Sequence, residues 1–243
     1  MNIFHVHTYR CGHAEHVSDE EYVKKAIALG AKEIWFTDHT PFPGDPFNYQ
    51  MRYGDLEEYL HTLRELKQKY SVIKIHIGLE TEYLPHFDEM GYYKYLRSLP
   101  DLEMLLLGQH IAETSSDPLT YSFSESDDFL NANEYKLLGN AIVQASKTEY
   151  FDAIAHPDRI FRRCDTWNAE MEAVSTAIIQ AAMTADIPLE MNLLSAENSE
   201  NHKRQFWQLV PDKAKRVIGF DAHSVHEMEL RFTGISERLN RFE

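Results

Sequence analysis

Histidine is concentrated near the start of the chain, in the segment FHVHTYRCGH at residues 4–13. His5 and His7 are separated by one residue, and in a β-strand this spacing places both side chains on one face. Phe4 and Val6 are then expected on the opposite face. Two imidazole rings roughly 7 Å apart by strand rise can bind the same cation. The pattern also fits two histidines that only form hydrogen bonds inside a polar barrel end, so other segments must distinguish the two interpretations.

Six of the seven strand-like segments end on residue types that bind metals, and the remaining one ends in the polar segment EMN at residues 190–192. The candidate residues at these ends are His5, His7, Asp38, His39, Glu80, His110, His156, Asp221 and His223. Active sites of barrels lie at the carboxyl ends of the strands, because the loops that follow converge there. Histidines placed at random would scatter over helices and loops. The pattern therefore indicates a metal site.

The ligand types narrow the choice of metal. Imidazole and carboxylate without thiolate suit zinc, iron or manganese at a catalytic centre, where an open position binds water. Glu80 is central among the candidates, and one carboxylate among several imidazoles can bridge two cations. Two cations roughly 3.5–4 Å apart suit the hydrolysis of phosphate esters. Cys11 lies in the first ligand-bearing loop, where we expect it to pack rather than to bind metal.

Strand-like and helix-like segments alternate along the whole chain. The expected strands cover residues 2–7, 33–39, 72–80, 103–110, 150–156, 187–192 and 216–223, and later helices cover 86–98, 131–147, 169–185 and 199–209. Ser18 with Glu21 predicts a capping box at a first helix, and Asp55 predicts the N-cap of a second. Seven β/α units predict an α/β fold, a closed or nearly closed barrel of mainly parallel strands in a single domain over residues 1–243. A doubly wound open sheet is the competing architecture.

The composition excludes several classes of function. A net charge of −15 over 243 residues argues against nucleic acid as a partner, because binding to a phosphate backbone needs a basic surface. No stretch approaches about 18 consecutive apolar residues, so we expect no membrane-spanning helix. We recognise no secretory signal, and two cysteines suit a reducing cytoplasm. A small phosphorylated substrate stays compatible with the charge, since bound cations reverse the local potential.

The motifs at the strand ends resemble those of one family. H-V-H at 5–7, His13, T-D-H at 37–39, G-L-E at 78–80, G-Q-H at 108–110, A-H-P-D at 155–158 and D-A-H at 221–223 are similar to the motifs of the PHP (polymerase and histidinol phosphatase) family. The resemblance implies a distorted seven-stranded (β/α) barrel with up to three metal ions at its carboxyl-terminal face. The implied ligand sets are His5, His7, Glu80 and Asp221 for a first ion, Glu80, His110 and His156 for a second, and His13, His39 and His223 for a third. Asp38 would then orient a ligand histidine, although a direct role stays open.

Within this family, the chain length and the segments GLETEY and GQHI look most like histidinol-phosphate phosphatases. Those enzymes release phosphate from L-histidinol phosphate in histidine biosynthesis. They tend to read E-I-N-x-S-G and then a basic residue after the sixth strand, where this chain reads EMNLLSAENSENHKRQ. Glu190 and Asn192 match, but the glycine is missing and the basic residues Lys203 and Arg204 come late. More residues therefore support the type of reaction than support the identity of the substrate.

The expected reaction is hydrolysis of a phosphomonoester with two to three divalent transition-metal ions, zinc, manganese or iron. A hydroxide between two cations would attack phosphorus. Arg162, or else Arg159, would bind the phosphoryl oxygens, unless both belong to a solvated basic loop. Asp38 or His223 would pass a proton to the leaving alkoxide. The long segment at 111–129, with aromatic and acidic residues, is the expected wall for the leaving group.

Three alternatives stay open. The chain could be a PHP phosphoesterase acting on another small phosphate or on nucleic-acid ends, and the acidic charge weakens the second version. A metal-dependent amidohydrolase also begins with H-x-H, but Glu80 stands where such an enzyme would use a modified lysine on a later strand. A metal-binding regulator without catalysis is a third interpretation, from a different class of function.

Overall fold

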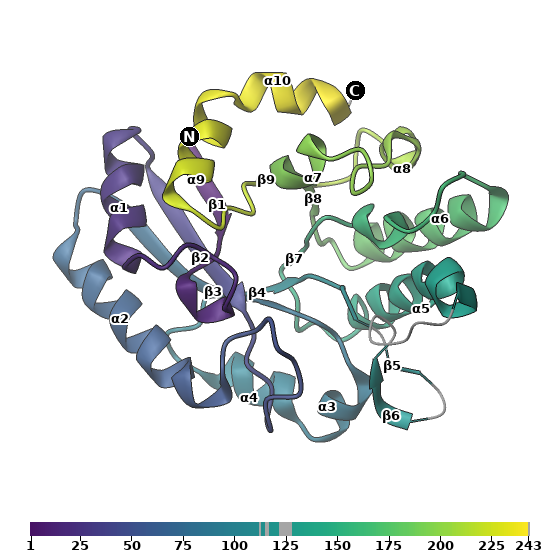
Figure 1. Cartoon of the computed structure of the whole chain (residues 1–243), viewed down its shortest axis with the longest axis horizontal. Helices are drawn as coiled ribbons and strands as arrows, with labels where there is room; N and C mark the ends of the chain where they lie inside the picture. The colour runs from purple at the N-terminus through teal and green to yellow at the C-terminus, as the bar shows by residue number, and fades with distance from the viewer. Residues whose placement is uncertain (112, 115–116, 122–127, 243) are drawn as a thin grey trace.

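Seven parallel strands form one sheet in the order β1–β2–β3–β4–β7–β8–β9 (Figure 1). The computed structural model describes residues 1–111, 113–114, 117–121 and 128–242. The strands are β1 (Asn2–Val6), β2 (Glu33–His39), β3 (Lys74–Thr81), β4 (Met104–Leu107), β7 (Ala153–Ile154), β8 (Leu189–Asn192) and β9 (Arg216–Gly219). All seven lie within or at the edge of segments predicted as strands, because long Val, Ile and Leu runs are typical of strands buried on both faces.

The chain beyond β9 closes the sheet against β1. Val6 and Ala222 form a parallel bridge, and the backbone N–H of Phe220 donates to Phe4 O at 2.7 Å. The N–H of His7 donates to Ala222 O at 2.9 Å. The strands therefore form a nearly closed barrel, which confirms the predicted architecture over the doubly wound open sheet.

Helices surround the barrel on its outer side, and a two-stranded antiparallel sheet follows β4 (Figure 1). The helices are α1 (Asp19–Ala28), α2 (Leu56–Lys69), α3 (Pro85–Glu89), α4 (Tyr92–Ser98), α5 (Asp128–Ala145), α6 (Ala169–Thr184), α7 (Leu193–Glu197), α8 (Arg204–Leu209), α9 (Val225–Thr233) and α10 (Ile235–Leu239). The short helical turns are η1 (Tyr9–Cys11), η2 (Tyr53–Asp55), η4 (Arg159–Phe161) and η5 (Asn240–Phe242), and the small sheet consists of β5 (Glu113–Thr114) and β6 (Asp117–Tyr121). Among the described residues, no helix combines the length and apolar content needed to cross a membrane.

Several helix boundaries differ from the prediction. The helix expected over 86–98 is two helices, because Gly91 takes a left-handed φ of 76° between them. Ser18 precedes α1 as its N-cap, but its side chain forms no capping hydrogen bond, and the N–H of Glu21 donates to the Ser18 carbonyl instead. Asp55 likewise precedes α2 without a side-chain capping bond. The helix expected over 199–209 begins only at Arg204.

The interior of the barrel has an apolar floor at the amino-terminal side. Phe4, Leu106, Ala153 and Ala155 form this cluster, which contains only strand residues and their immediate neighbours. Val6 packs instead in the larger core that includes the helices, so the prediction that Phe4 and Val6 share a face is wrong. The reason is a backbone irregularity in β1. His5 takes a φ of 69°, and the register against β2 shifts between Ile3 and Val6.

Candidate metal centre

The predicted ligands converge at the carboxyl ends of the strands, around a cavity of about 540 Å³. The predicted residues that line this cavity are His13, His39, Glu80, His110, Arg159, Arg162, Asp221 and His223. His5, His7 and His156 lie beneath them and are buried. The structure thus brings all nine predicted ligands to one end of the barrel.

The first group consists of His5, His7, Glu80 and Asp221. The Nε2 atoms of His5 and His7 are 2.9 Å apart, and they lie 3.3 and 3.4 Å from Glu80 Oε2. Asp221 Oδ1 is 3.3 Å from His7 Nε2 and 3.8 Å from His5 Nε2. Ligand atoms around a tetrahedral zinc ion, with bonds of about 2.0–2.1 Å, are separated by roughly 3.3 Å. Both the spacing and the donor types fit a divalent ion.

The two carboxylate oxygens of Glu80 face different sets of histidines. Oε2 faces His5, His7 and also His39, whose Nδ1 is 3.2 Å away. Oε1 lies 2.8 Å from His156 Nε2 and 3.8 Å from His110 Nε2. This arrangement fits a carboxylate that contributes one oxygen to each of two neighbouring ions.

The third group lies nearer the cavity opening. The Nε2 atoms of His13 and His223 are 3.0 Å apart, and a ligand atom of His39 lies within 4.8 Å of both rings' ligand atoms. His39 stands between groups, because it also belongs to a cluster with Glu80 and His110.

The carboxylates beside His5 and His7 favour the protonated form of these two imidazoles. Burial lowers the pKa of His7, but hydrogen bonds with Asp221 and Asp38 outweigh this effect and raise the pKa to about 9. Burial also lowers the pKa of His5, and the charge of Glu190 foremost raises it well above its usual value. Burial raises the pKa of Asp221, whereas the neighbouring imidazoles, His5 above all, lower it well below the usual range. Asp221 therefore stays anionic, and His5 and His7 favour the protonated form.

Three residues to which the sequence analysis assigned no role, Glu190, Asn192 and Glu82, hold the ligands in place. Glu190 Oε1 is 2.6 Å from His5 Nδ1, and its Oε2 accepts the N–H of His156 at 2.9 Å. The Asn192 amide donates to Glu190 at 2.9 Å and to Asp221 Oδ2 at 3.1 Å. Such outer partners fix ring orientation and tautomer.

Glu82 supports His110 in the same way. Its Oε1 is 2.8 Å from His110 Nδ1, and its Oε2 accepts the backbone N–H groups of His110 and Ile111. The sequence contained a signal for this residue, because Glu82 follows Glu80 by two positions and strand alternation places both on one face.

The backbone is strained at three of the candidate ligands. His5, His156 and Asp221 have φ values of 69°, 27° and 49°, in the left-handed region that non-glycine residues rarely adopt. Such conformations cost about 1–3 kcal/mol each and concentrate at functional sites. Gly108 permits the close approach of Glu80, since a Cβ atom at position 108 would overlap the Glu80 carboxylate.

The model of the PHP domain matches residues 4–193 of this sequence. The chain belongs to the PHP domain family. A curated relative, the histidinol-phosphatase of Bacillus subtilis (strain 168), is 31% identical over 129 residues, which are 50% of this chain and 48% of the relative. The probable histidinol-phosphatase of Deinococcus radiodurans is 26% identical over 163 residues, which are 63% of this chain and 59% of the relative. The chain thus spans about half the length of the curated relatives it matches.

Two solved structures share the fold of this PHP domain protein. The putative histidinol phosphatase of Listeria monocytogenes has a TM-score of 0.74 at 19% identity, with 93% of this chain and 97% of that chain covered. The histidinol phosphate phosphatase of Lactococcus lactis subsp. lactis, solved in complex with zinc, L-histidinol and phosphate, has a TM-score of 0.70 at 20% identity. The second match covers 97% of this chain and 92% of that chain.

Both predicted phosphate-binding arginines of the PHP domain reach the cavity. Arg159 belongs to η4, and its Nη1 donates to His110 Nε2 at 2.8 Å. Because Nε2 has one lone pair, a cation bound to this nitrogen would release the Arg159 guanidinium. Arg162 follows η4, is exposed and also lines the cavity.

Asp38 lies below the cavity and is fully buried. Its Oδ1 accepts the backbone N–H of His39 at 3.0 Å and lies 3.6 Å from His7 Nδ1, and the hydroxyl of Thr8 donates to its Oδ2. This placement favours the predicted orienting role over direct proton transfer to substrate.

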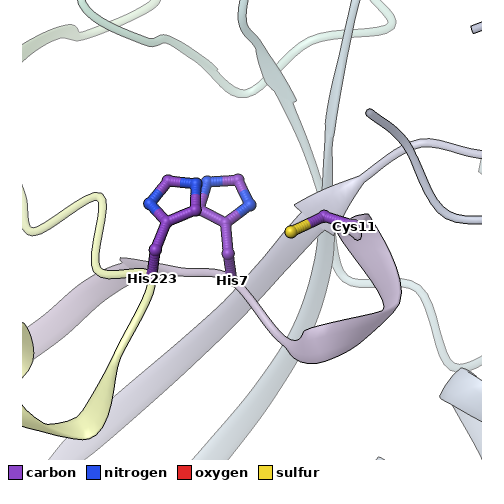
Figure 2. A group of neighbouring side chains, drawn as sticks. All are labelled: His7, Cys11 and His223. Atoms are coloured by element: carbon purple, nitrogen blue, oxygen red, sulfur yellow. The ribbon is translucent and has the colours of Figure 1, made fainter. Parts of the chain in front are cut away.

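Cys11 lies beside two candidate ligands. Figure 2 shows its sulfur directed toward the stacked rings of His7 and His223, whose centroids are 4.2 Å apart. Potential ligand atoms of the three residues lie within 4.8 Å of one another. Burial, together with the charge of Asp38, raises the pKa of the Cys11 thiol. The expectation that Cys11 packs rather than binds metal stays a prediction.

Proposed function

We propose that this protein is a metal-dependent phosphatase that hydrolyses phosphomonoesters, with L-histidinol phosphate as its substrate. The observation that carries the proposal is the position of Glu80, whose two oxygens face separate groups of histidines at the base of one cavity. The printed names of the curated relatives, and the ligands of the Lactococcus lactis structure, support the choice of substrate.

Two to three divalent ions, zinc, manganese or iron, would be held by the three ligand groups described above. When bound, such ions lower the pKa of a water molecule and offset negative charge on phosphoryl oxygens. The chain itself supplies the surroundings. Glu190, Asn192 and Glu82 orient the ligand side chains, and the buried base of the cavity limits access of bulk water.

The arginines and the cavity size support a small phosphorylated substrate. Arg159 and Arg162 both line the cavity, where their N–H groups can donate to phosphoryl oxygens. A volume of about 540 Å³ is typical of sites for small molecules. The interpretation of residues 1–243 as one domain stays a prediction.

The sequence offers Asp38 or His223 as the source of the proton for the leaving alkoxide. Asp38 lies below the cavity, where it accepts hydrogen bonds from His39 and Thr8. His223 does line the cavity, but burial and the charge of His7 lower its pKa to about 3, so its ring stays neutral. A neutral ring is the form that binds metal, and we therefore favour the ligand role of His223 over the proton relay.

A panel of phosphomonoesters, assayed with Mn²⁺ and Zn²⁺ added separately, tests the proposal. L-histidinol phosphate is expected to have the highest kcat/KM, and metal analysis of the purified protein should find two to three ions per chain. A preference for an aryl phosphate or a nucleotide would contradict the proposed substrate but not the proposed phosphatase activity. Metal binding without turnover of any ester would favour a regulatory protein.

A further inference from the structure

One segment of the cavity wall contains none of the candidate metal ligands and neither of the two arginines. Phe47, Asn48, Tyr49 and Gln50 all line the cavity, and they belong to the loop between β2 and η2. The loop is fixed at both sides of this stretch. The N–H of Met51 donates to the His39 carbonyl at 3.3 Å, and the ring of Phe47 packs edge-on against Phe42 with centroids 5.5 Å apart.

Tyr49 presents an aromatic surface at the opening of the cavity. Its side chain is largely exposed, since 64% of the residue is accessible. Its ring makes a T-shaped contact with that of His13, with centroids 6.1 Å apart at an angle of 81°. The exposed part of the ring is therefore available to a ligand that enters beside His13.

The remaining contacts indicate how a phosphomonoester would lie. On one side of the cavity, Arg159 contacts His110. Tyr49 instead adjoins the third histidine group, through His13 and its partner His223. A phosphoryl group bound by the arginines and the ligand groups leaves the ester's alcohol portion to extend toward the opening, where Tyr49 stands.

We propose that Tyr49 forms a wall of the leaving-group subsite and selects phosphomonoesters whose alcohol carries a flat aromatic ring. This inference rests on the proposed phosphatase function and adds a residue that contacts the leaving group. An aromatic pair gains from stacking beyond the area that it buries, and a protonated imidazole gains further from the negative face of the tyrosine ring. The side chains of most of the segment at 111–129, the wall predicted from the sequence, lie outside the described residues.

The test compares two substrates that differ only in the ring. L-alaninol phosphate is L-histidinol phosphate without its imidazole, so it keeps the amine and the ester. Tyr49→Ala is expected to reduce kcat/KM for L-histidinol phosphate roughly 3- to 10-fold and to change that for L-alaninol phosphate less than about 2-fold. The loss should appear mainly in KM, because stacking on the ring is equal in the ground state and the transition state. Tyr49→Phe should retain the ring preference.

Tyr53 offers a matched control, because it is another exposed tyrosine of the same region and does not line the cavity. Tyr53→Ala should leave both substrates unaffected. Calorimetry with L-histidinol and L-alaninol, which needs no turnover, should show weaker binding of L-histidinol alone to the Tyr49→Ala protein. Equal losses for the two substrates, or no loss, would overturn the subsite. Absence of hydrolysis of every ester by the wild-type protein would instead reject the proposed function, and the calorimetry would still report on Tyr49.

Discussion

At the level of single residues, Glu80 connects more of the candidate ligands than any other side chain described above. Burial raises the pKa of this carboxyl, but the charges of His5, His39 and His110 lower it well below the usual range, so it stays ionised. An ionised, buried carboxylate is costly unless positive charge lies beside it, and His5, whose pKa is raised, favours the charged form next to Glu80. Its environment therefore favours the binding of ions on both of its oxygens.

Replacement of Glu80 tests this role. Glu80→Gln should keep the fold but lower phosphatase turnover at least roughly 100-fold and reduce the metal content, because both groups lose a shared anionic ligand. Turnover with L-histidinol phosphate and metal analysis of the purified variant provide the measurement. Glu33→Gln, at the opposite end of the sheet, is the control and should behave like the wild type. A Glu80→Gln protein with normal turnover and metal content would show that Glu80 does not bridge ions.

At the level of elements, the sequence pattern predicted the barrel but not the local structure that positions the ligands. Long apolar runs that end on His, Asp or Glu are visible in a sequence, and they predicted both the strands and the ligands. The left-handed backbone at His5 is not visible, because it depends on how β1 pairs with its neighbours. Helices α7 and α10 were missed as well. They are short, and packing at the carboxyl end of the chain stabilises them more than intrinsic propensity does.

Helix α9 contacts the site through Arg231, which is almost fully buried. Its Nη1 donates to the carbonyl of Asp221 at 2.9 Å, and its Nη2 donates to Glu197 of α7 at 3.0 Å. Asp221 is one of the strained candidate ligands, so this hydrogen bond holds an otherwise unfavourable backbone conformation.

Loss of Arg231 should therefore weaken metal binding. Arg231→Met is expected to lower metal affinity roughly 10- to 100-fold, as other changes to partners of ligand residues do. Competition with a chelator of known affinity measures the effect, and circular dichroism reports whether the fold is kept. Arg238→Met is the matched control, since Arg238 also contacts Glu197 but donates to Leu230 and Gly234 rather than to Asp221. Equal metal affinities for the two variants would assign Arg231 to general stability.

At the level of the whole molecule, the site is complete only when the barrel closes. The match to the PHP domain ends at residue 193, whereas Asp221 and His223 follow β9. The same backbone bonds that pair this segment with β1 bring Asp221 beside His5 and His7. The candidate ligands thus come from both ends of the sequence, which couples metal binding to the integrity of the whole fold.

This coupling predicts opposite effects of pH on the metal-free and metal-loaded protein. The folded pKa of His7, about 9, lies above the value of about 6.5 expected when unfolded, so its stabilising contribution is complete below pH 6.5 and lost as pH rises through 9. Thermal unfolding after chelator treatment should therefore show a Tm that falls between pH 6.5 and 9. A bound ion requires the unprotonated ring, so the increase in Tm caused by added Zn²⁺ should grow over the same range. His7→Gln should flatten the decline in the metal-free protein, while His61→Gln, on the exposed face of α2, should leave it unchanged. A metal-free Tm that rises across this range would contradict the charge distribution inferred for the site.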